Sequence, residues 1–375
     1  MNDFLYYLSI NNAIYALFII IVALIISFFL NKIIDITPMG SNNDLSLEGL
    51  RGISCLLVFI AHSYLAVSTT GIKSPTFEIQ PIYAFAKMGS FGVDMFFCLT
   101  GFLFAAVIKN SKIDLSFFQR RIYRLLPAYL VASTIILIIF VSLKYSQIKS
   151  IDDILLLLQR IYGFGFWGNG IKLGNSIDNN LNVVIWTLPY EWKFYAIIPF
   201  LACAYSIKSL RILIIPFSCI VIYFGYTNDT VLWTNFLTGF LASYIKKSEK
   251  KLTRYISYMI MIILFVYILF TKQKPHAFET YLCISAFFFL FIYSRPSIFK
   301  NKIISNIGIV SYSLYLLHQP ALSITFNLYS MFIDLKNIST NLFMTLLTGS
   351  ILLALLSSYI MYNYIEKRFR LPSSK

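Results

Sequence analysis

The sequence predicts an all-α polytopic membrane protein with about eleven transmembrane helices. Of its 375 residues, 58% are hydrophobic and only 13% are charged, whereas about a quarter of the residues in a soluble protein are charged. Apolar runs recur along the whole chain, and many are long enough for the hydrocarbon core, which needs about 20 helical residues per crossing. Runs of this length favour helices over the shorter strands of a membrane barrel.

Eleven apolar stretches are predicted as membrane helices, and no soluble domain is expected between them. The first stretch lacks a basic segment before it and a small-residue cleavage site after it, so we predict a membrane helix rather than a signal peptide. The longest stretch between spans, residues 145–184, contains glycines and asparagines that mark turns, and we expect a lid or binding surface there. The predicted spans are 13–30, 50–68, 86–108, 126–143, 185–203, 209–226, 230–245, 255–271, 279–294, 306–326 and 343–364.

The net charge of +15 indicates topology rather than a nucleic-acid partner. Of the 31 lysines and arginines, 21 fall in alternate inter-helix segments, which is the positive-inside pattern of a protein embedded in membrane lipid. This pattern predicts an N-terminus outside and a cytoplasmic C-terminus. The five cysteines lie inside apolar spans without CxxC spacing, so neither a disulfide framework nor a metal site is predicted.

Polar residues inside predicted spans are the first candidates for function because they are costly in lipid. Arg51 and His62 are eleven residues apart, almost three helical turns, so both lie on one helix face. The helical rise separates them by about 16 Å, which places His62 near mid-membrane if Arg51 marks the cytoplasmic boundary. Glu48 precedes Arg51 by three residues and is expected to hold its guanidinium.

Three further spans carry polar groups to a similar depth. The spans that carry Asp94 and Glu191 are predicted to enter the membrane from the outer side. Ser311 and His318 share one face of a helix that enters from the cytoplasm. Each group could instead be a structural hydrogen-bonding partner of a neighbouring helix. Four ionisable groups at matching depth favour function, and we predict that the two imidazoles and two carboxylates converge.

Three arginines stand at the start of the span 126–143, in the stretch "RRIYRLLP". Arg120, Arg121 and Arg124 suit a phosphorylated cytoplasmic ligand, because guanidinium groups bind phosphate with two parallel hydrogen bonds. Ordinary anchoring to anionic lipid explains the same charges, and charge alone favours that interpretation.

Five ordered motifs resemble those of the membrane acyltransferase-3 family, which includes O-antigen and other surface-polysaccharide O-acetylases. An Arg and a His separated by ten residues resemble the opening helix of the family, and a closing "YNYIEKRFR" resembles its final signature. Together the motifs cover residues 47–370. The five are "LEGLRGISCLLVFIAH", "FGVDMFFCLTGF", "RRIYRLLP", "WTLPYEWKFY" and "GIVSYSLYLLHQP".

The resemblance implies an acyltransferase-3 membrane domain over residues 47–370. Residues 1–46 would then add an N-terminal transmembrane helix and a cytoplasmic linker, and 371–375 would form a cytoplasmic tail. The implied location is the bacterial inner membrane. The sequence leaves no room for the periplasmic esterase-like domain that some members append, so direct transfer to the acceptor is expected.

The resemblance also implies substrates and roles. Acetyl-CoA on the cytoplasmic side would be the acyl donor, with its phosphates held by Arg120, Arg121 and Arg124 and its pantetheine path beside Arg51. A hydroxyl of a surface glycan such as an O-antigen polysaccharide, or of a lipid-linked oligosaccharide, would be the acceptor.

The intramembrane groups then receive roles in acyl transfer. His62 would act as general base or carry the acyl group covalently, and the sequence leaves both open. Asp94 or Glu191 would fix its tautomer. His318 and Ser311 are candidates for stabilising the oxyanion or orienting the sugar, with Trp186 and Tyr315 as further acceptor-binding residues. His276, in an outer loop, is expected to be an ordinary surface histidine.

Two other classes of protein compete with the enzyme. A transporter or flippase for a lipid-linked glycan would use the same ionisable residues as a proton relay or substrate path. A scaffold of an envelope complex would tolerate the loss of His62.

Overall fold

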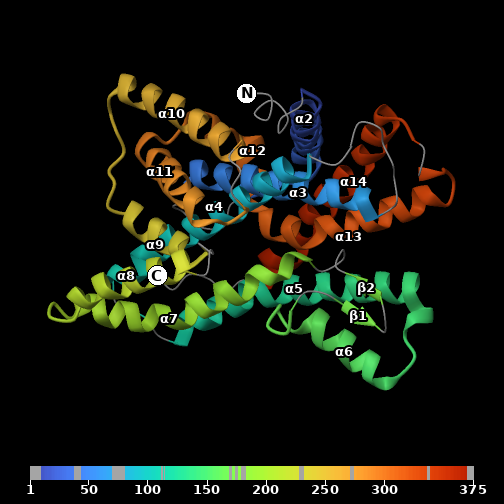
Figure 1. Cartoon of the computed structure of the whole chain (residues 1–375), viewed down its shortest axis with the longest axis horizontal. Coiled ribbons are helices and arrows are strands. Elements are labelled where there is room, and N and C mark those ends of the chain that lie inside the picture. Colours follow the sequence, from blue (N-terminus) through green and yellow to red (C-terminus); the bar gives the residue numbers. More distant parts are fainter. Residues whose placement is uncertain are drawn as a thin grey trace.

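The computed structural model describes residues 10–37, 44–69, 81–110, 113, 115–168, 171–173, 176–178, 183–227, 232–270, 274–335 and 338–369. These residues are almost entirely helical (Figure 1), so the predicted all-α polytopic membrane fold is confirmed. The exception is one short antiparallel hairpin of β1 (Ile171–Leu173) and β2 (Ser176–Asp178). The helices are α2 Ile10–Ile33, α3 Leu45–Thr69, α4 Pro81–Asn110, α5 Leu115–Lys144, α6 Ile151–Tyr162, α7 Leu188–Ser206, α8 Ile214–Thr227, α9 Leu232–Ala242, α10 Lys251–Phe270, α11 Phe278–Ser294, α12 Lys302–Ile309, α13 Ser311–Ser330, α14 Thr340–Met361 and α15 Lys367–Phe369.

The described part of each of the eleven predicted spans is mostly helical, but the helices differ in length; residues 230, 231 and 271 of these spans lie outside the described residues. Within the described residues, six are long and apolar enough to cross a membrane: α2, α3, α4, α5, α10 and α14. The others are shorter or less apolar. The stretch predicted as one span over 306–326 is divided, because α12 ends at Ile309 and α13 begins at Ser311. The number eleven therefore stays a prediction.

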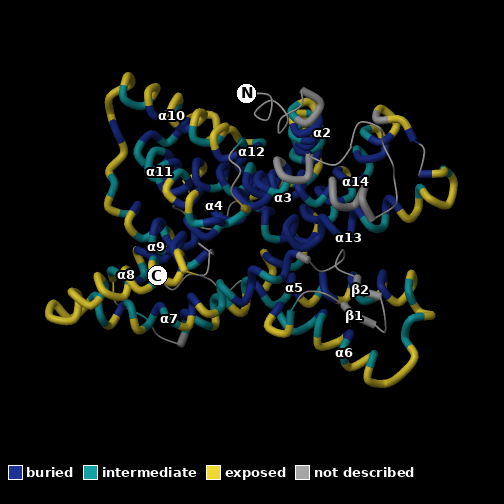
Figure 2. The backbone as a smooth tube through the Cα atoms, in the orientation of Figure 1, coloured by how far each residue is buried: buried dark blue, intermediate teal, exposed yellow. Residues whose placement is uncertain are grey.

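Helices α3, α4 and α13 form the buried centre of the molecule (Figure 2). Helix α3 packs on α4, α12 and α13, and α4 packs on α9. Glycines bring α4 and α9 together, as expected for membrane helices. A Cβ added to Gly101 would lie 2.1 Å from the Phe236 carbonyl oxygen, and one on Gly239 would lie 2.0 Å from that of Cys98. Only glycine fits at this crossing.

The periphery carries exposed apolar side chains, as a lipid-facing surface requires. Helices α8 and α10 expose isoleucine, phenylalanine and tyrosine side chains along most of their length (Figure 2). In water such a surface would be a large exposed apolar patch. In a bilayer it contacts acyl chains instead.

The described residues of the stretch 145–184, which was predicted to be an outer loop, are more regular than expected. It contains α6, which begins with a capping box made by Ser150 and Asp153. The Tyr129 hydroxyl on α5 donates to the Ile161 carbonyl of α6 at 2.7 Å. It also accepts from the Phe164 backbone N–H at 2.9 Å. This segment is thus fastened to α5 rather than forming a simple loop; its predicted role as a lid or binding surface stays a prediction.

The start of α3 is fixed by Asp44 and Arg295. The Arg295 guanidinium donates to Asp44 Oδ2 at 2.8 Å, and the backbone N–H of Ser46 donates to Asp44 Oδ1 at 2.9 Å. Burial raises the pKa of Asp44, but the Ser46 hydroxyl and the Arg295 charge outweigh it, so the pKa lies below its usual value. This anchor holds the end of α3 that carries Arg51.

Candidate active site

Two histidines from different helices meet at the centre of the molecule. His62 Nδ1 on α3 lies 2.8 Å from His318 Nε2 on α13, and the two rings stack with centroids 5.0 Å apart. His318 Nδ1 lies 3.0 Å from the Leu314 carbonyl oxygen. The predicted convergence of the two imidazoles is therefore confirmed.

The Leu314 carbonyl determines which nitrogens carry protons. A carbonyl only accepts, so the neutral His318 donates from Nδ1 and accepts at Nε2. His62 must then donate from Nδ1, which leaves the lone pair on His62 Nε2. This assignment follows from the hydrogen-bond network. It leaves His62 Nε2 as the basic nitrogen of the pair.

His62 opens onto a cavity of about 180 Å³, which we call the histidine cavity. Its wall is mixed: apolar side chains and aromatic rings stand beside two imidazoles and the hydroxyl-bearing residues Ser90 and Tyr315. The lining residues are Val58, Ala61, His62, Ala86, Gly89, Ser90, Val93, Trp186, Pro275, His276 and Tyr315. Trp186, predicted to bind the acceptor, lies in this wall.

A second cavity of about 320 Å³, which we call the arginine cavity, holds most of the other predicted residues. Its charged lining consists of Arg51, Arg121, Arg124, Glu48, Glu191 and Glu366; Thr100, Ser311, Tyr195, Tyr312 and Tyr362 contribute polar groups. Ser311 therefore faces this cavity and not the one that contains His62.

The two cavities share Val93 and Tyr315, which line both. The Tyr315 hydroxyl donates to the Val184 carbonyl oxygen at 3.0 Å and lies 3.0 Å from Thr187 Oγ1. Its ring packs edge-on against Phe96, with centroids 6.0 Å apart. Tyr315 thus forms part of the wall between the arginines and His62.

The predicted arginines divide into two groups. Arg51 donates to Glu48 at 3.1 Å, which confirms the expected pair, and both side chains are 14% exposed. Arg121 stacks over Phe104 with its guanidinium carbon 5.0 Å from the ring centroid. Arg124 lines the cavity beside it, whereas Arg120 is absent from the lining and donates to Ser116. Arg120, which was predicted to act together with Arg121 and Arg124, therefore does not line this cavity.

Besides Glu48, two further carboxylates line the arginine cavity. Glu191 accepts from the Tyr195 hydroxyl at 3.2 Å and lies within electrostatic reach of Arg124, Arg51 and Arg121. It was predicted to orient His62; instead it balances the arginines, because α7 presents it to their cavity. Glu366, to which no role was assigned, accepts from Ser313. It ends a π-helical turn, a departure from regular helix that often marks functional sites.

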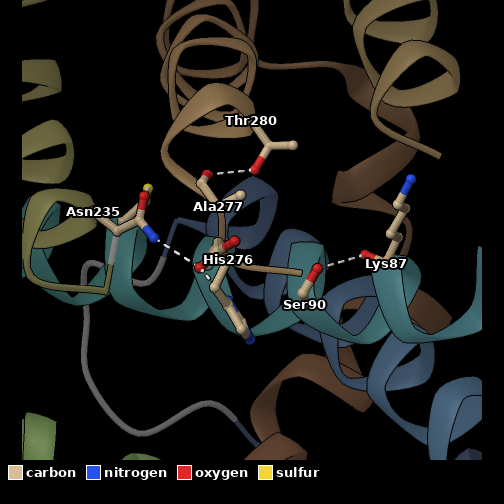
Figure 3. Close-up of polar contacts among 8 residues, drawn as sticks. Lys87, Ser90, Asn235, His276, Ala277 and Thr280 are labelled. Atoms are coloured by element: carbon tan, nitrogen blue, oxygen red, sulfur yellow. Dashed lines mark hydrogen bonds and ion pairs between the residues drawn. The ribbon is translucent and has the colours of Figure 1, made fainter. Parts of the chain in front are cut away.

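Asp94, the other carboxylate predicted to orient His62, has different partners. It is fully buried, and its Oδ1 accepts from Asn235 Nδ2 of α9 at 2.8 Å. The same oxygen lies 3.0 Å from His276 Nδ1 (Figure 3). Within the described residues, the ring partner of His62 is His318 and not a carboxylate. The depth of Asp94 was predicted from its distance along the helix, but its side chain points toward α9 and the α10–α11 connection.

His276 differs from the surface histidine that the sequence suggested. Its side chain is only 18% exposed and forms an ion pair with Asp94 when protonated. It lines the histidine cavity together with His62. One indirect signal was present in the sequence: an aspartate inside a predicted membrane span needs a partner.

His318 is not free to stabilise an oxyanion, a role for which it was a candidate. Both of its ring nitrogens are engaged, one with His62 and one with Leu314. Within the described residues no group of three His, Cys, Asp or Glu side chains is arranged to hold a metal ion. Cys98 lies beside the Asp94 network, with Sγ 3.8 Å from Asn235 Oδ1.

The comparison with protein families decides the class of this site. A family model described as an acyltransferase domain, that of the acyltransferase-3 family, matches residues 44–363. The chain belongs to this family. The matched region contains the histidine pair, the Asp94–His276 pair and the lining of both cavities except Glu366. The prediction of an acyltransferase is confirmed at the level of the family.

Relatives of this acyltransferase-3 chain carry a related name. Three proteins named "Putative O-acetyltransferase", from Staphylococcus aureus strains COL, MSSA476 and MRSA252, are each 25% identical to it over 372 residues. The alignment covers 86% of this chain and 57% of each relative. The chain therefore spans little more than half the length of the curated relatives that it matches. No solved structure matches it at a significant level.

Proposed function

We propose that this acyltransferase-3 chain is a membrane O-acetyltransferase, which moves the acetyl group of cytoplasmic acetyl-CoA to a hydroxyl of a surface glycan or lipid-linked oligosaccharide. Its place is the bacterial inner membrane, with the N-terminus outside and the C-terminus in the cytoplasm. The alternation of basic segments along the sequence supports this orientation. The arginine cavity then receives the donor and the histidine cavity the acceptor.

The tautomer of His62 supports its role as general base. His62 Nε2 takes the proton of the acceptor hydroxyl while that oxygen attacks the thioester carbonyl carbon. His318 accepts a hydrogen bond from His62 Nδ1–H and so keeps the His62 ring oriented. When the C–S bond breaks, the same proton passes from His62 to the departing thiolate. A relay in which His62 first takes the acetyl group uses the same nitrogen.

The arginine cavity suits the phosphates of the donor. Arg51, Arg121 and Arg124 converge on one space, and each bidentate arginine–phosphate contact is among the stronger hydrogen-bonded pairs in proteins. The carboxylates of Glu48, Glu191 and Glu366 balance these cations before the donor binds, so the phosphates must compete with them.

The shared wall of Val93 and Tyr315 is the observation that carries the proposal. A pantetheine arm held by the arginines points its thioester toward this wall, and His62 lies in the cavity directly beyond it. Movement of the Tyr315 ring would bring the thioester and the acceptor hydroxyl together. Because the reaction takes place at this wall, only the thioester end of the donor has to reach it, and the rest of the donor stays in the arginine cavity.

Purified protein in liposomes tests this function. We expect labelled acetyl-CoA and a glycan extract from cells that lack the protein to yield acetylated glycan and an equal amount of free coenzyme A. His62→Ala should abolish both products, and mass spectrometry of the glycan identifies the ester. Movement of glycan across the bilayer without ester formation would contradict the proposal and favour the transporter.

A further inference from the structure

The histidine cavity contains a second imidazole that is held by a carboxylate. His276 Nδ1 lies 3.0 Å from Asp94 Oδ1, and Asn235 Nδ2 donates to the same oxygen at 2.8 Å (Figure 3). Because Asp94 is fully buried, these two partners replace water at Oδ1, whereas Oδ2 has no hydrogen-bond partner among the described residues. The carboxylate binds the Nδ1–H of His276, so Nε2 is the ring nitrogen left for a molecule in the cavity.

The backbone at His276 is held in a costly conformation. Its φ is +60°, in the left-handed region that residues with a Cβ rarely adopt. The ring packs edge-on against Trp186, with centroids 5.5 Å apart. Such strain persists where the surrounding structure enforces it, and it clusters at functional sites. Here it directs a loop residue down onto Asp94 and the cavity wall.

The two cavity imidazoles have opposite surroundings. His62 is backed by a neutral imidazole, which leaves a lone pair on its Nε2. His276 is backed by a carboxylate, and when it is protonated it forms an ion pair with Asp94 and carries a proton on its Nε2. Pairs of titratable groups in contrasting environments commonly divide acid and base roles. One nitrogen in the cavity therefore accepts a proton, and the other donates a hydrogen bond.

We propose that His276 is a catalytic residue that donates a hydrogen bond from Nε2–H to the thioester carbonyl oxygen, with Asp94 as its positioning residue. This inference rests on the proposed function. As the acceptor oxygen attacks and His62 takes its proton, the carbonyl oxygen gains negative charge, which the imidazolium stabilises. When the tetrahedral intermediate collapses, the C–S bond breaks and the thiolate takes the proton from His62. His276 keeps its own proton throughout.

No other described histidine is placed for this task. His318 has both ring nitrogens engaged, and Ser311 faces the arginine cavity. An oxyanion donor must lie on the same cavity as the base, and His276 meets that condition.

Three variants test the proposal in the liposome assay with labelled acetyl-CoA and the glycan extract. His276→Ala should lower the turnover rate about 10²- to 10³-fold, the usual effect of removing one oxyanion donor. The KM for acetyl-CoA should stay unchanged. His276→Gln keeps an N–H donor close to the Nε2 position and should recover part of the rate. Asp94→Asn should lower the turnover rate less than His276→Ala does.

The readouts separate the possible failures. An active wild type with an equally active His276→Ala variant would overturn the role of His276 alone. Equal losses in His276→Ala and His276→Gln, together with weakened binding of coenzyme A in both, would indicate a structural role and also overturn it. A wild type that forms no ester from acetyl-CoA would overturn the proposed function and this inference together.

Discussion

Replacement of His318 tests whether the histidine pair works as one unit. His318→Ala removes the Nε2 atom that accepts the hydrogen bond from His62 Nδ1–H, at a distance of 2.8 Å between the two nitrogens. His62 itself remains. An unsatisfied buried donor costs about 1–3 kcal/mol, and each 1.4 kcal/mol or so changes a rate tenfold. If the hydrogen bond between His62 and His318 stabilises the transition state by this amount, the turnover rate should fall about 5- to 150-fold.

His62→Ala should be more damaging than His318→Ala. Loss of a general base typically lowers the rate about 10²- to 10⁴-fold. Since His318 is expected to act only through His62, the double variant should be no slower than His62→Ala. His318→Gln is the matched control, because its side-chain amide oxygen can replace the Nε2 acceptor and restore part of the rate.

The assay is single-turnover transfer from labelled acetyl-CoA in liposomes, with acetyl-CoA and acceptor varied separately. The KM values should stay within a few-fold of wild type, because His318 lines neither cavity. Losses that multiply in the double variant would refute the reasoning, since they would mean that His318 acts on the substrate independently of His62.

Other perturbations test the cavities and the helix packing. Arg124→Gln should raise the KM for acetyl-CoA about 10-fold or more, as for a lost charged hydrogen bond, whereas Arg120→Gln, outside the cavity lining, should change it little; initial rates measure both. Tyr315→Ala should join the two cavities and increase hydrolysis of acetyl-CoA in the absence of glycan. Tyr315→Phe keeps the ring and should increase this hydrolysis much less. Release of free thiol without acceptor measures both variants. Gly101→Ala should destabilise the protein by about 1–3 kcal/mol, because its Cβ would lie 2.1 Å from a backbone oxygen. Thermal unfolding in detergent measures this, with Ala106→Leu at an exposed position as the control. Melting of both variants at the wild-type temperature would contradict the prediction.

The sequence predicted the histidine pair because depth along a membrane helix follows from counting residues. His62 and His318 were placed at one level by the helical rise, and the structure brings them together. Depth does not determine which neighbour a side chain faces. Asp94 and Glu191 also matched in depth, yet one binds Asn235 and His276 and the other faces the arginines. Helix order around the bundle decides this, and it depends on packing between distant segments.

His276 was overlooked for a different reason. It lies outside every apolar span, where a polar residue costs nothing and therefore signals nothing. Its importance depends on a left-handed backbone that folds the loop inward. Likewise, the apolar stretch 306–326 predicts one continuous helix, whereas α12 ends at Ile309 and α13 begins at Ser311.

The partition at Val93 and Tyr315 also matters for the membrane around the enzyme. Moving one elementary charge through a membrane potential releases about 2.3 kcal/mol per 100 mV, so a continuous wet passage would let ions and protons leak and would discharge the cell. In the proposed function, two side chains that seal the passage between turnovers would allow donor and acceptor to approach from opposite faces while the bilayer remains electrically tight. An acyltransferase that works in this way would carry a group across the membrane without becoming a channel.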